Sequence, residues 1–367
     1  MLLPGRACLL WGLGIISLLA GWQGMDASMA LAIPQEPSSQ VTALKVDVPV
    51  PARNLSQPGQ SKAGTTGPST PAAPSLPPAI AGPAQEQQWP LGRIEAAPFA
   101  SAARSGPPVL VAILDTGIDG SHRDLAGKVV SNIGFVEDTS TADLYGHGTP
   151  IAGIIAADVD SGSGIAGLAP ESRLLNVKVA DDRGKARDID IADGIIWSVE
   201  NGARVINISI ELGDSTPRLK EAVDYAWSRG AIIVAAAGND GNSQPVYPAA
   251  YESCLGVTAI RENGDLAPLA NYGEWVDVAA PGFDIYTTLP GDTFGLKHGT
   301  SFAAAYVSGL AALLYPLVTD DEGDGYVNDE VCQAIYAACR DTGIPGTGRG
   351  LIDVAGSLAE AEKTSNK

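Results

Sequence analysis

Four polar residues of the chain have the side-chain chemistry of an acyl-transfer site: Asp115, His147, Asn239 and Ser301. A serine hydroxyl attacks a carbonyl group when a histidine accepts its proton, and a carboxylate can hold that histidine in the required tautomer. An asparagine amide can stabilise the oxyanion that forms in the attack. Asp115 and Asn239 each follow an apolar, strand-like run, and His147 and Ser301 each begin a helix-like segment. The four positions therefore predict nucleophilic catalysis, provided that the fold brings them together.

Each of the four residues also has a structural interpretation when it is taken alone. An aspartate at a strand end is most often a turn or capping residue, and asparagine next to glycine usually marks a turn. A serine before a helix is most often its N-cap, and a lone histidine is more often structural than catalytic. The joint occurrence of all four at strand ends and helix starts favours the catalytic interpretation.

The segments that must position these residues alternate between strand-like and helix-like patterns. Continuous apolar runs predict strands buried on both faces at residues 108–114, 174–179, 204–210, 231–237 and 255–260. Helical patterns occupy residues 149–157, 188–200, 217–229 and 301–315. This alternation predicts an α/β fold with a central, mostly parallel sheet and helices on both faces, in which sites form beyond the carboxyl ends of the strands.

The helix that begins near Ser301 is expected to be buried on every side. No charged residue occurs between Ser301 and Val318, and a helix without a polar face belongs in a core. Pro316 should end this helix because it lacks an amide donor. Ser301 would then lie in a rigid, partly dry site near the positive end of the helix dipole.

The residues around the four positions resemble the motifs of the subtilisin family of serine peptidases. The matching segments are Asp115-Thr116-Gly117-Ile118-Asp119, His147-Gly148-Thr149 with Ala152-Gly153, and Gly299-Thr300-Ser301 with Ala303. The resemblance covers roughly residues 86–362, and residues 89–97 and 348–353 resemble the family's opening and closing segments. It implies a subtilisin-like three-layer fold, a triad of Asp115, His147 and Ser301, and an oxyanion-binding Asn239. Peptide-bond hydrolysis by this route passes through an acyl-enzyme and requires no cofactor.

The same resemblance implies where the substrate binds. The family holds its substrate as an extended strand against backbone edges. The corresponding residues of this chain are Ser209, Ile210, Glu211, Ala236 and Gly238.

Glu211 and Phe302 depart from the family pattern, which usually has glycine and methionine at these positions. Two interpretations of Glu211 are open. The carboxylate either charges the pocket rim and favours a basic or polar P1 residue, the residue whose carbonyl is attacked, or it points to solvent. Phe302 lacks a thioether, so we expect peroxide to inactivate this chain less than a relative with methionine.

The other histidines and one aspartate have weaker assignments. His122 matches a family position that is not catalytic, and His298 could contact the substrate, tune His147 or lie at the surface. Asp124 matches a family calcium ligand, which implies a structural calcium, although the partner loop at 158–164 differs in length and composition. The acidic run at 320–325 has the turn glycine of an EF-hand loop but Val331 at the glutamate position, which favours a solvated turn.

Composition and the N-terminal segment indicate the compartment. A formal net charge of -19 over 367 residues argues against nucleic acid and against anionic membrane surfaces. Arg6, the apolar run 7–20 and a small-residue site at 30–32 predict a signal peptide at 1–32. We therefore expect a secreted or periplasmic protein without strong membrane association after cleavage; an uncleaved segment would leave it anchored.

Residues 33–85 are rich in proline, serine and alanine and predict a flexible tether, followed by the catalytic domain at 86–363 and a tail at 364–367. Cys254, Cys332 and Cys339 would remain after signal cleavage. Cys332 and Cys339 are two helical turns apart, about 10 Å, which is too far for a disulfide. Buried thiols are the favoured interpretation.

Protein or peptide substrates are the expected partners, and two other functions compete with peptide hydrolysis. The first is a subtilisin-like fold that has weak or no activity and binds other molecules; the filled catalytic positions argue against it. The second is an esterase, but the chain has no Gly-x-Ser-x-Gly motif.

Overall fold

The computed structural model describes residues 88–96, 107–137, 140–158 and 164–365. The predictions of a signal peptide at 1–32 and a tether at 33–85 lie outside these residues.

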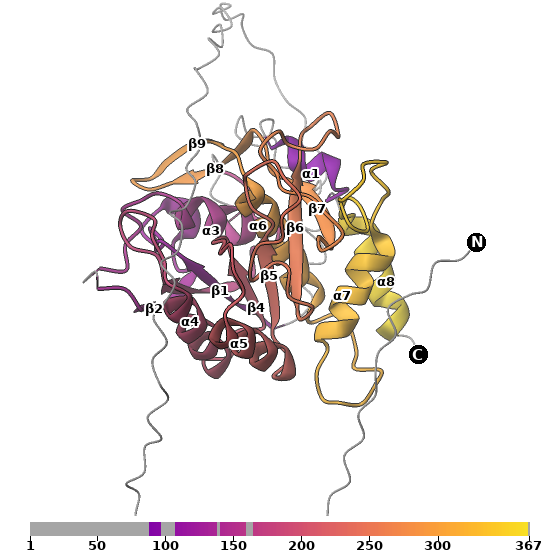
Figure 1. The fold of residues 1–367 in the computed structure, drawn as a ribbon, viewed down its shortest axis with the longest axis horizontal. Helices are drawn as coiled ribbons and strands as arrows, with labels where there is room; N and C mark the ends of the chain where they lie inside the picture. The colour runs from indigo at the N-terminus through magenta and orange to yellow at the C-terminus, as the bar shows by residue number, and fades with distance from the viewer. Residues whose placement is uncertain (1–87, 97–106, 138–139, 159–163, 366–367) are drawn as a thin grey trace, which may run out of the picture. The chain divides into compact units, whose positions relative to one another are not determined.

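A seven-stranded sheet forms the centre of the fold, in the order β2-β3-β1-β4-β5-β6-β7 (Figure 1). Every neighbouring pair in it runs parallel, which confirms the predicted type of sheet. The strands are β1 (Leu110–Asp115), β2 (Val129–Gly134), β3 (Arg173–Lys178), β4 (Val205–Ile208), β5 (Ile232–Ala236), β6 (Cys254–Ile260) and β7 (Val278–Pro281).

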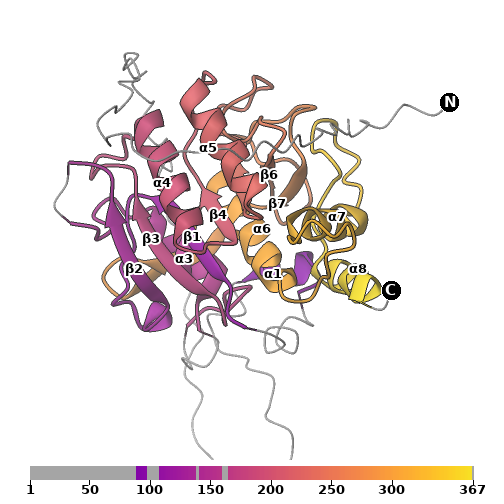
Figure 2. The ribbon, with the colours of Figure 1, turned by 90° about the horizontal axis from the view of Figure 1, so that it is seen from below.

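Helices cover both faces of this sheet, and alternate residues of β1 pack against the two helix layers. Val111 and Ile113 face the core under α3 (Gly148–Ala156) and α6 (Thr300–Leu314). Ala112 and Leu114 face a second core with α4 (Asp188–Glu200) and α5 (Pro217–Ser228) (Figure 2). Alternate residues of a strand point to opposite faces, so a strand between two helix layers has to be apolar throughout.

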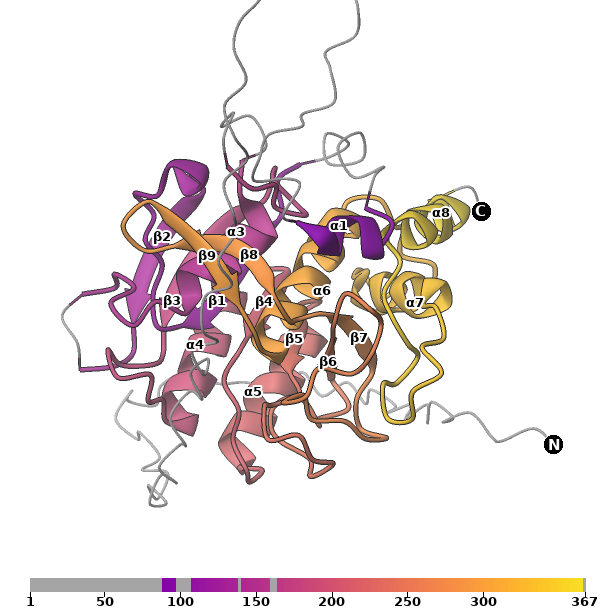
Figure 3. The same ribbon diagram turned by 90° about the horizontal axis from the view of Figure 1, so that it is seen from above.

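An antiparallel hairpin of β8 (Ile285–Leu289) and β9 (Thr293–Lys297) lies against α3 (Figure 3). The hydroxyls of Thr287 and Thr288 bond it there, donating to the carbonyl oxygens of Pro150 and Thr149 at 2.8 Å each. The remaining elements are α1 (Trp89–Arg93), the 3-10 helix η2 (Arg123–Leu125), α7 (Asn328–Ala338) and α8 (Val354–Ser365).

Helix α6 is buried along its whole length, as its sequence predicts. Its N-cap is Gly299, and Ser301 is its second residue, so the N-cap interpretation of Ser301 is wrong. No helix within the described ranges is long and apolar enough to cross a membrane. Cys254, Cys332 and Cys339 are free thiols, and the first two are buried, as expected.

Candidate active site

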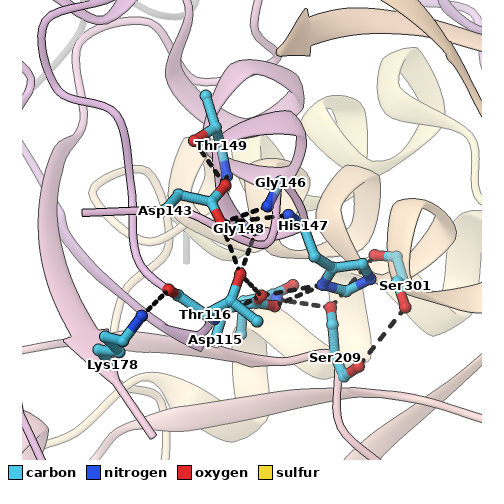
Figure 4. A network of polar contacts seen from close by, with 11 residues as sticks. Asp115, Thr116, Asp143, Gly146, His147, Gly148, Thr149, Lys178, Ser209 and Ser301 are labelled. Atoms are coloured by element: carbon cyan, nitrogen blue, oxygen red, sulfur yellow. Dashed lines mark hydrogen bonds and ion pairs between the residues drawn. The ribbon is translucent and has the colours of Figure 1, made fainter. Parts of the chain in front are cut away.

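Asp115 and His147, which are 32 residues apart in sequence, are in direct contact. Nδ1 of His147 lies 2.9 Å from Oδ1 and 3.0 Å from Oδ2 of Asp115. The Asp115 side chain is fully buried, whereas that of His147 is 14% exposed. The imidazole is drawn between Asp115 and Ser301 in Figure 4. One ring nitrogen is therefore held by the carboxylate, and the ring keeps some access to solvent.

The ends of β1 and α3 position this pair. Asp115 is the last residue of β1, and His147 is the N-cap of α3. The two elements approach so closely at Gly148 that a Cβ there would lie 2.1 Å from the carbonyl oxygen of Gly117. Glycine after the histidine is thus a steric requirement of the contact.

The pKa of His147 lies above the ordinary imidazole value of 6.5. Burial lowers this pKa, but the charge of Asp115 and its hydrogen bond to the ring outweigh burial. Asp143 adds a smaller upward effect, and the positive charge of Lys297 opposes it. The environment therefore favours the imidazolium form.

Sequence analysis missed Asp143, a buried carboxylate that organises the loop before α3. Its Oδ1 accepts hydrogen bonds from the Thr116 hydroxyl at 2.7 Å and from the amides of Gly146 and His147 at 2.8 and 3.3 Å. Its Oδ2 accepts from both the amide and the hydroxyl of Thr149, at 2.8 and 2.7 Å. Asp143 thus ties the residue after Asp115 to the residues around His147. In the sequence, only its position four residues before His147 could have indicated this role.

Lys178 is a second residue that the sequence analysis did not single out. It is fully buried and aligns with Asp115 in the β1–β3 register. Its Nζ donates to the carbonyl oxygens of Thr116 and Ala142 at 2.7 and 3.3 Å and to Oδ1 of Asp182 at 2.6 Å. Lys178 therefore links the end of β1 to the loop that carries Asp143. A lysine at the end of a largely apolar strand was the signal for this role.

A buried chain of hydrogen bonds fixes the start of α6 to the end of β4. Ser308 Oγ donates to Asn207 Oδ1 at 2.9 Å, and Asn207 Nδ2 donates to Ser209 Oγ at 2.9 Å. Ser209 Oγ in turn donates to the carbonyl oxygen of Ser301 at 3.4 Å. The Ser301 hydroxyl donates to the carbonyl oxygen of Ser209 at 3.5 Å. The next residue, Phe302, has its ring centroid 5.7 Å from that of His147. Ser301, in the first turn of α6, therefore lies on the side of the helix where His147 is (Figure 4).

Asn239 follows β5 and faces the same helix start. Its Oδ1 accepts from the amide and the hydroxyl of Thr300 at 2.9 and 3.2 Å. The amide of Gly238 donates to the Thr300 hydroxyl at 3.1 Å. Asn239 is therefore bound through its oxygen to Thr300, the residue before Ser301, at the first turn of α6.

The five expected substrate-binding residues lie at the ends of two neighbouring strands: Ala236 is the last residue of β5, and the other four follow β4 or β5. β4 stops pairing with β1 and β5 at Ile208, so residues 209–211 continue beyond the sheet. The side chains of Ser209, Ile210 and Ala236 are buried, so Ile210 and Ala236 can offer a peptide only backbone groups. Glu211 is half-buried, and its Oε2 lies 2.3 Å from the point that a Cβ on Gly238 would occupy. The interpretation that Glu211 points to solvent is wrong.

The other two histidines have structural contacts. His122 is fully buried, with Nδ1 accepting from the amide of Asp124 at 3.1 Å and Nε2 lying 3.0 Å from the carbonyl oxygen of Thr293. His298 packs on the ring of Phe283, and its Nδ1 accepts from the amide of Asp284 at 3.0 Å. Its side chain is only 9% exposed, so the surface interpretation of His298 is wrong.

The two acidic candidates for metal binding differ in surroundings. Asp124 is fully buried; its Oδ2 accepts from the amide of Ile165 at 2.9 Å, and its Oδ1 has no hydrogen-bond partner among the described residues. In the acidic run, Asp320 closes an exposed turn by accepting from the amides of Gly323 and Gly325. The part of the chain that the structure describes holds no group of three or more His, Cys, Asp or Glu side chains that could bind a metal ion.

Comparisons with known proteins identify the class that this fold and site define. The sequence profile of the subtilase family matches residues 106–344. The chain therefore belongs to the subtilase family of serine peptidases.

Individual relatives carry protease names. The chain is 44% identical over 239 residues to the thermophilic serine proteinase of Bacillus sp. (strain AK1), a match that spans 65% of this chain and 57% of that protein. It is 43% identical to thermitase of Thermoactinomyces vulgaris, over 59% of this chain and 78% of that protein. A solved structure of a protease from Pseudoalteromonas arctica PAMC 21717 superposes with a TM-score of 0.69 and 27% identity, over 76% of this chain and 98% of that one.

Proposed function

We propose that this chain is a serine endopeptidase in which Ser301 attacks the peptide bond, His147 transfers the proton and Asp115 orients His147. The observation that carries the proposal is the contact of His147 Nδ1 with both carboxylate oxygens of Asp115 at 2.9 and 3.0 Å. That contact places the Nδ1 proton toward the carboxylate and leaves Nε2 as the basic nitrogen.

The reaction proceeds in two halves. In acylation, Ser301 Oγ forms a bond to the carbonyl carbon while His147 Nε2 takes the hydroxyl proton and then donates it to the leaving amine. In deacylation, water attacks the acyl-enzyme in the same way and His147 returns the proton to Ser301. In the free protein the hydroxyl is bonded to the Ser209 carbonyl oxygen at 3.5 Å. Such a long bond breaks at little cost when Oγ turns to the imidazole on substrate binding.

Asn239 and the amide of Ser301 form the oxyanion hole in this proposal. The bonds from Thr300 to Asn239 Oδ1 support it, because they fix the amide before the substrate arrives. Donors fixed in advance stabilise the developing charge without reorganising. The substrate binds as an extended strand along residues 209–211, where β4 has run beyond its partners.

Replacing Ser301 by alanine tests the activity itself. We expect full-length Ser301→Ala to lose hydrolysis of casein and of peptide anilides while its thermal unfolding midpoint stays close to that of the unsubstituted protein. Turnover by the purified variant would refute the nucleophile. A binding protein without activity, the competing function, predicts that neither protein cleaves any peptide.

We also propose that the protein is exported and that Asp124 helps to bind a structural calcium ion. The apolar run 7–20 supports export. The buried Asp124 Oδ1 without a hydrogen-bond partner supports a cation there, since calcium prefers carboxylate and carbonyl oxygens. The ion would supply structural stability and no chemical step. Calcium should raise the unfolding midpoint of the natural protein and leave that of Asp124→Asn unchanged.

A further inference from the structure

Glu211 places a carboxylate against the backbone of Gly238, the residue before the proposed oxyanion asparagine. Its Oε2 and Cδ lie 2.3 and 3.2 Å from the point that a Cβ on Gly238 would occupy. Gly238 has a φ of 95°, a conformation that favours glycine, so its face stays open to the carboxylate. Any larger residue at position 238 would displace Glu211.

The strand order locates this carboxylate relative to the scissile bond. In the sheet, β1 with Asp115 is followed by β4 and then by β5. His147, which protonates the leaving amine, lies over the end of β1 through its contact with Asp115. The acyl side of the substrate must therefore lie toward the extensions of β4 and β5. Glu211 and Gly238 are on those extensions, so the carboxylate lies on the side that receives the P1 side chain.

A buried amide group lies beside the Glu211 carboxylate at the same face of Gly238. Asn271 is fully buried, and its Nδ2 lies 2.4 Å from the same Cβ point at Gly238. Oδ1 of Asn271 accepts from the amides of Asp240 and Asn242 at 2.9 and 3.3 Å, which orients the NH₂ group away from them. Nδ2 itself has no hydrogen-bond partner among the described residues. A buried amide donor is thus aimed at the space that Glu211 Oε2 enters.

We propose that Glu211 makes this chain selective for substrates with a basic P1 residue, lysine or arginine. This inference rests on the proposed function. The stem of lysine or arginine is apolar and can run along the backbone of residues 236–238, while its charged end reaches a half-buried carboxylate. A charge pair that is shielded from water is stronger than one at the surface, and the carboxylate disfavours an acidic P1 side chain.

The test measures kcat/KM on peptide anilides that differ only at P1, with lysine, arginine, glutamine, phenylalanine or glutamate. The full-length protein is compared with Glu211→Gln and with Glu221→Gln, which removes the same charge from an exposed site on α5. The active fraction of each preparation is counted by titration with a serine-directed fluorophosphonate. We expect the natural protein to prefer lysine over glutamine by about tenfold or more. Glu211→Gln should lose most of that ratio, and Glu221→Gln should keep it.

Three results would overturn the inference. The first is a natural protein that cleaves after phenylalanine better than after lysine. The second is an unchanged lysine-to-glutamine ratio in Glu211→Gln. Either of these, obtained with a normal active fraction, refutes the role of Glu211 and leaves the proposed function intact. The third is the absence of both a titratable serine and hydrolysis of every peptide, which would refute the proposed function and this inference with it.

Discussion

The hydroxyl of Thr300 donates to Asn239 Oδ1 at 3.2 Å while it accepts from the amide of Gly238 at 3.1 Å. One side chain on α6 therefore holds the segment after β5 that carries the proposed oxyanion donor. Thr300 is a positioning residue in this arrangement, because it acts on the oxyanion through Asn239.

Removing the Thr300 hydroxyl should lower the turnover rate more than substrate binding. In Thr300→Val, Asn239 keeps the bond from the Thr300 amide but loses the second anchor, and we expect kcat to fall about tenfold with little change in KM. Thr300→Ser keeps the hydroxyl and should stay within about threefold of the natural protein. Steady-state kinetics on one peptide anilide measures both. A loss in Thr300→Ser with none in Thr300→Val would show that the methyl group, and not the hydroxyl, matters.

Asp143 should be important for stability as well as for activity. Asp143→Asn keeps the shape but turns donor hydrogens toward the buried amides and hydroxyls that Asp143 now accepts. We expect the free energy of unfolding to fall by about 3 kcal/mol and kcat/KM by about tenfold or more, because His147 loses its support. Urea denaturation and peptide hydrolysis measure the two effects. Asp193→Asn, which removes a surface partner of Arg218, should cost about 1 kcal/mol or less. Similar stability losses in both variants would contradict this role of Asp143.

The raised pKa of His147 sets the sign of the pH dependence. Only the neutral imidazole accepts a proton, so kcat/KM should rise with pH and reach half its maximum above the ordinary imidazole value of 6.5. The stability that the charged form contributes is present below that ordinary value and is lost as the pH rises through the folded-state pKa. Asp115→Asn removes the largest upward effect and leaves the effect of burial, so the midpoint of its residual activity should move to lower pH. A midpoint that stays in place or moves upward would contradict this electrostatic account.

Phe302 should protect the site from oxidation. The ring is 1% exposed and contacts His147, and it has no sulfur to oxidise. We expect the natural protein to keep most of its activity after a peroxide treatment that inactivates Phe302→Met. The residual rate of peptide hydrolysis over time measures this difference. Equally fast inactivation of the two proteins would place the sensitive group elsewhere.

The sequence predicted the buried elements well because their patterns are strong. The range 188–200 matches α4 residue for residue, and the predicted strands correspond to β1, β3, β4, β5 and β6 within two residues at each end. The elements that were missed have weak patterns. In β2 half-buried and exposed residues alternate, β7 has only four residues, and β9 has no buried residue.

The residues of the candidate site also fall into those with a recognisable sequence pattern and those without one. Asp115, His147, Asn239 and Ser301 were found because they belong to local motifs. Asp143 and Lys178 depend on tertiary structure. Lys178 meets the residue after Asp115 only because β1 and β3 pair in the register that aligns Lys178 with Asp115. The direction of the Glu211 side chain could not be predicted either, because nothing near Glu211 in the sequence shows that Gly238 will leave room for its carboxylate.

The most direct test of the account is covalent labelling of the nucleophile. The full-length protein is treated with a fluorophosphonate, digested and mapped by mass spectrometry, beside Ser301→Ala and His147→Ala. We predict one phosphonylated residue, Ser301, with no labelling in Ser301→Ala and strongly slowed labelling in His147→Ala, because the attack needs the imidazole as its base. Label on another residue, or equal labelling rates in all three proteins, would contradict the account.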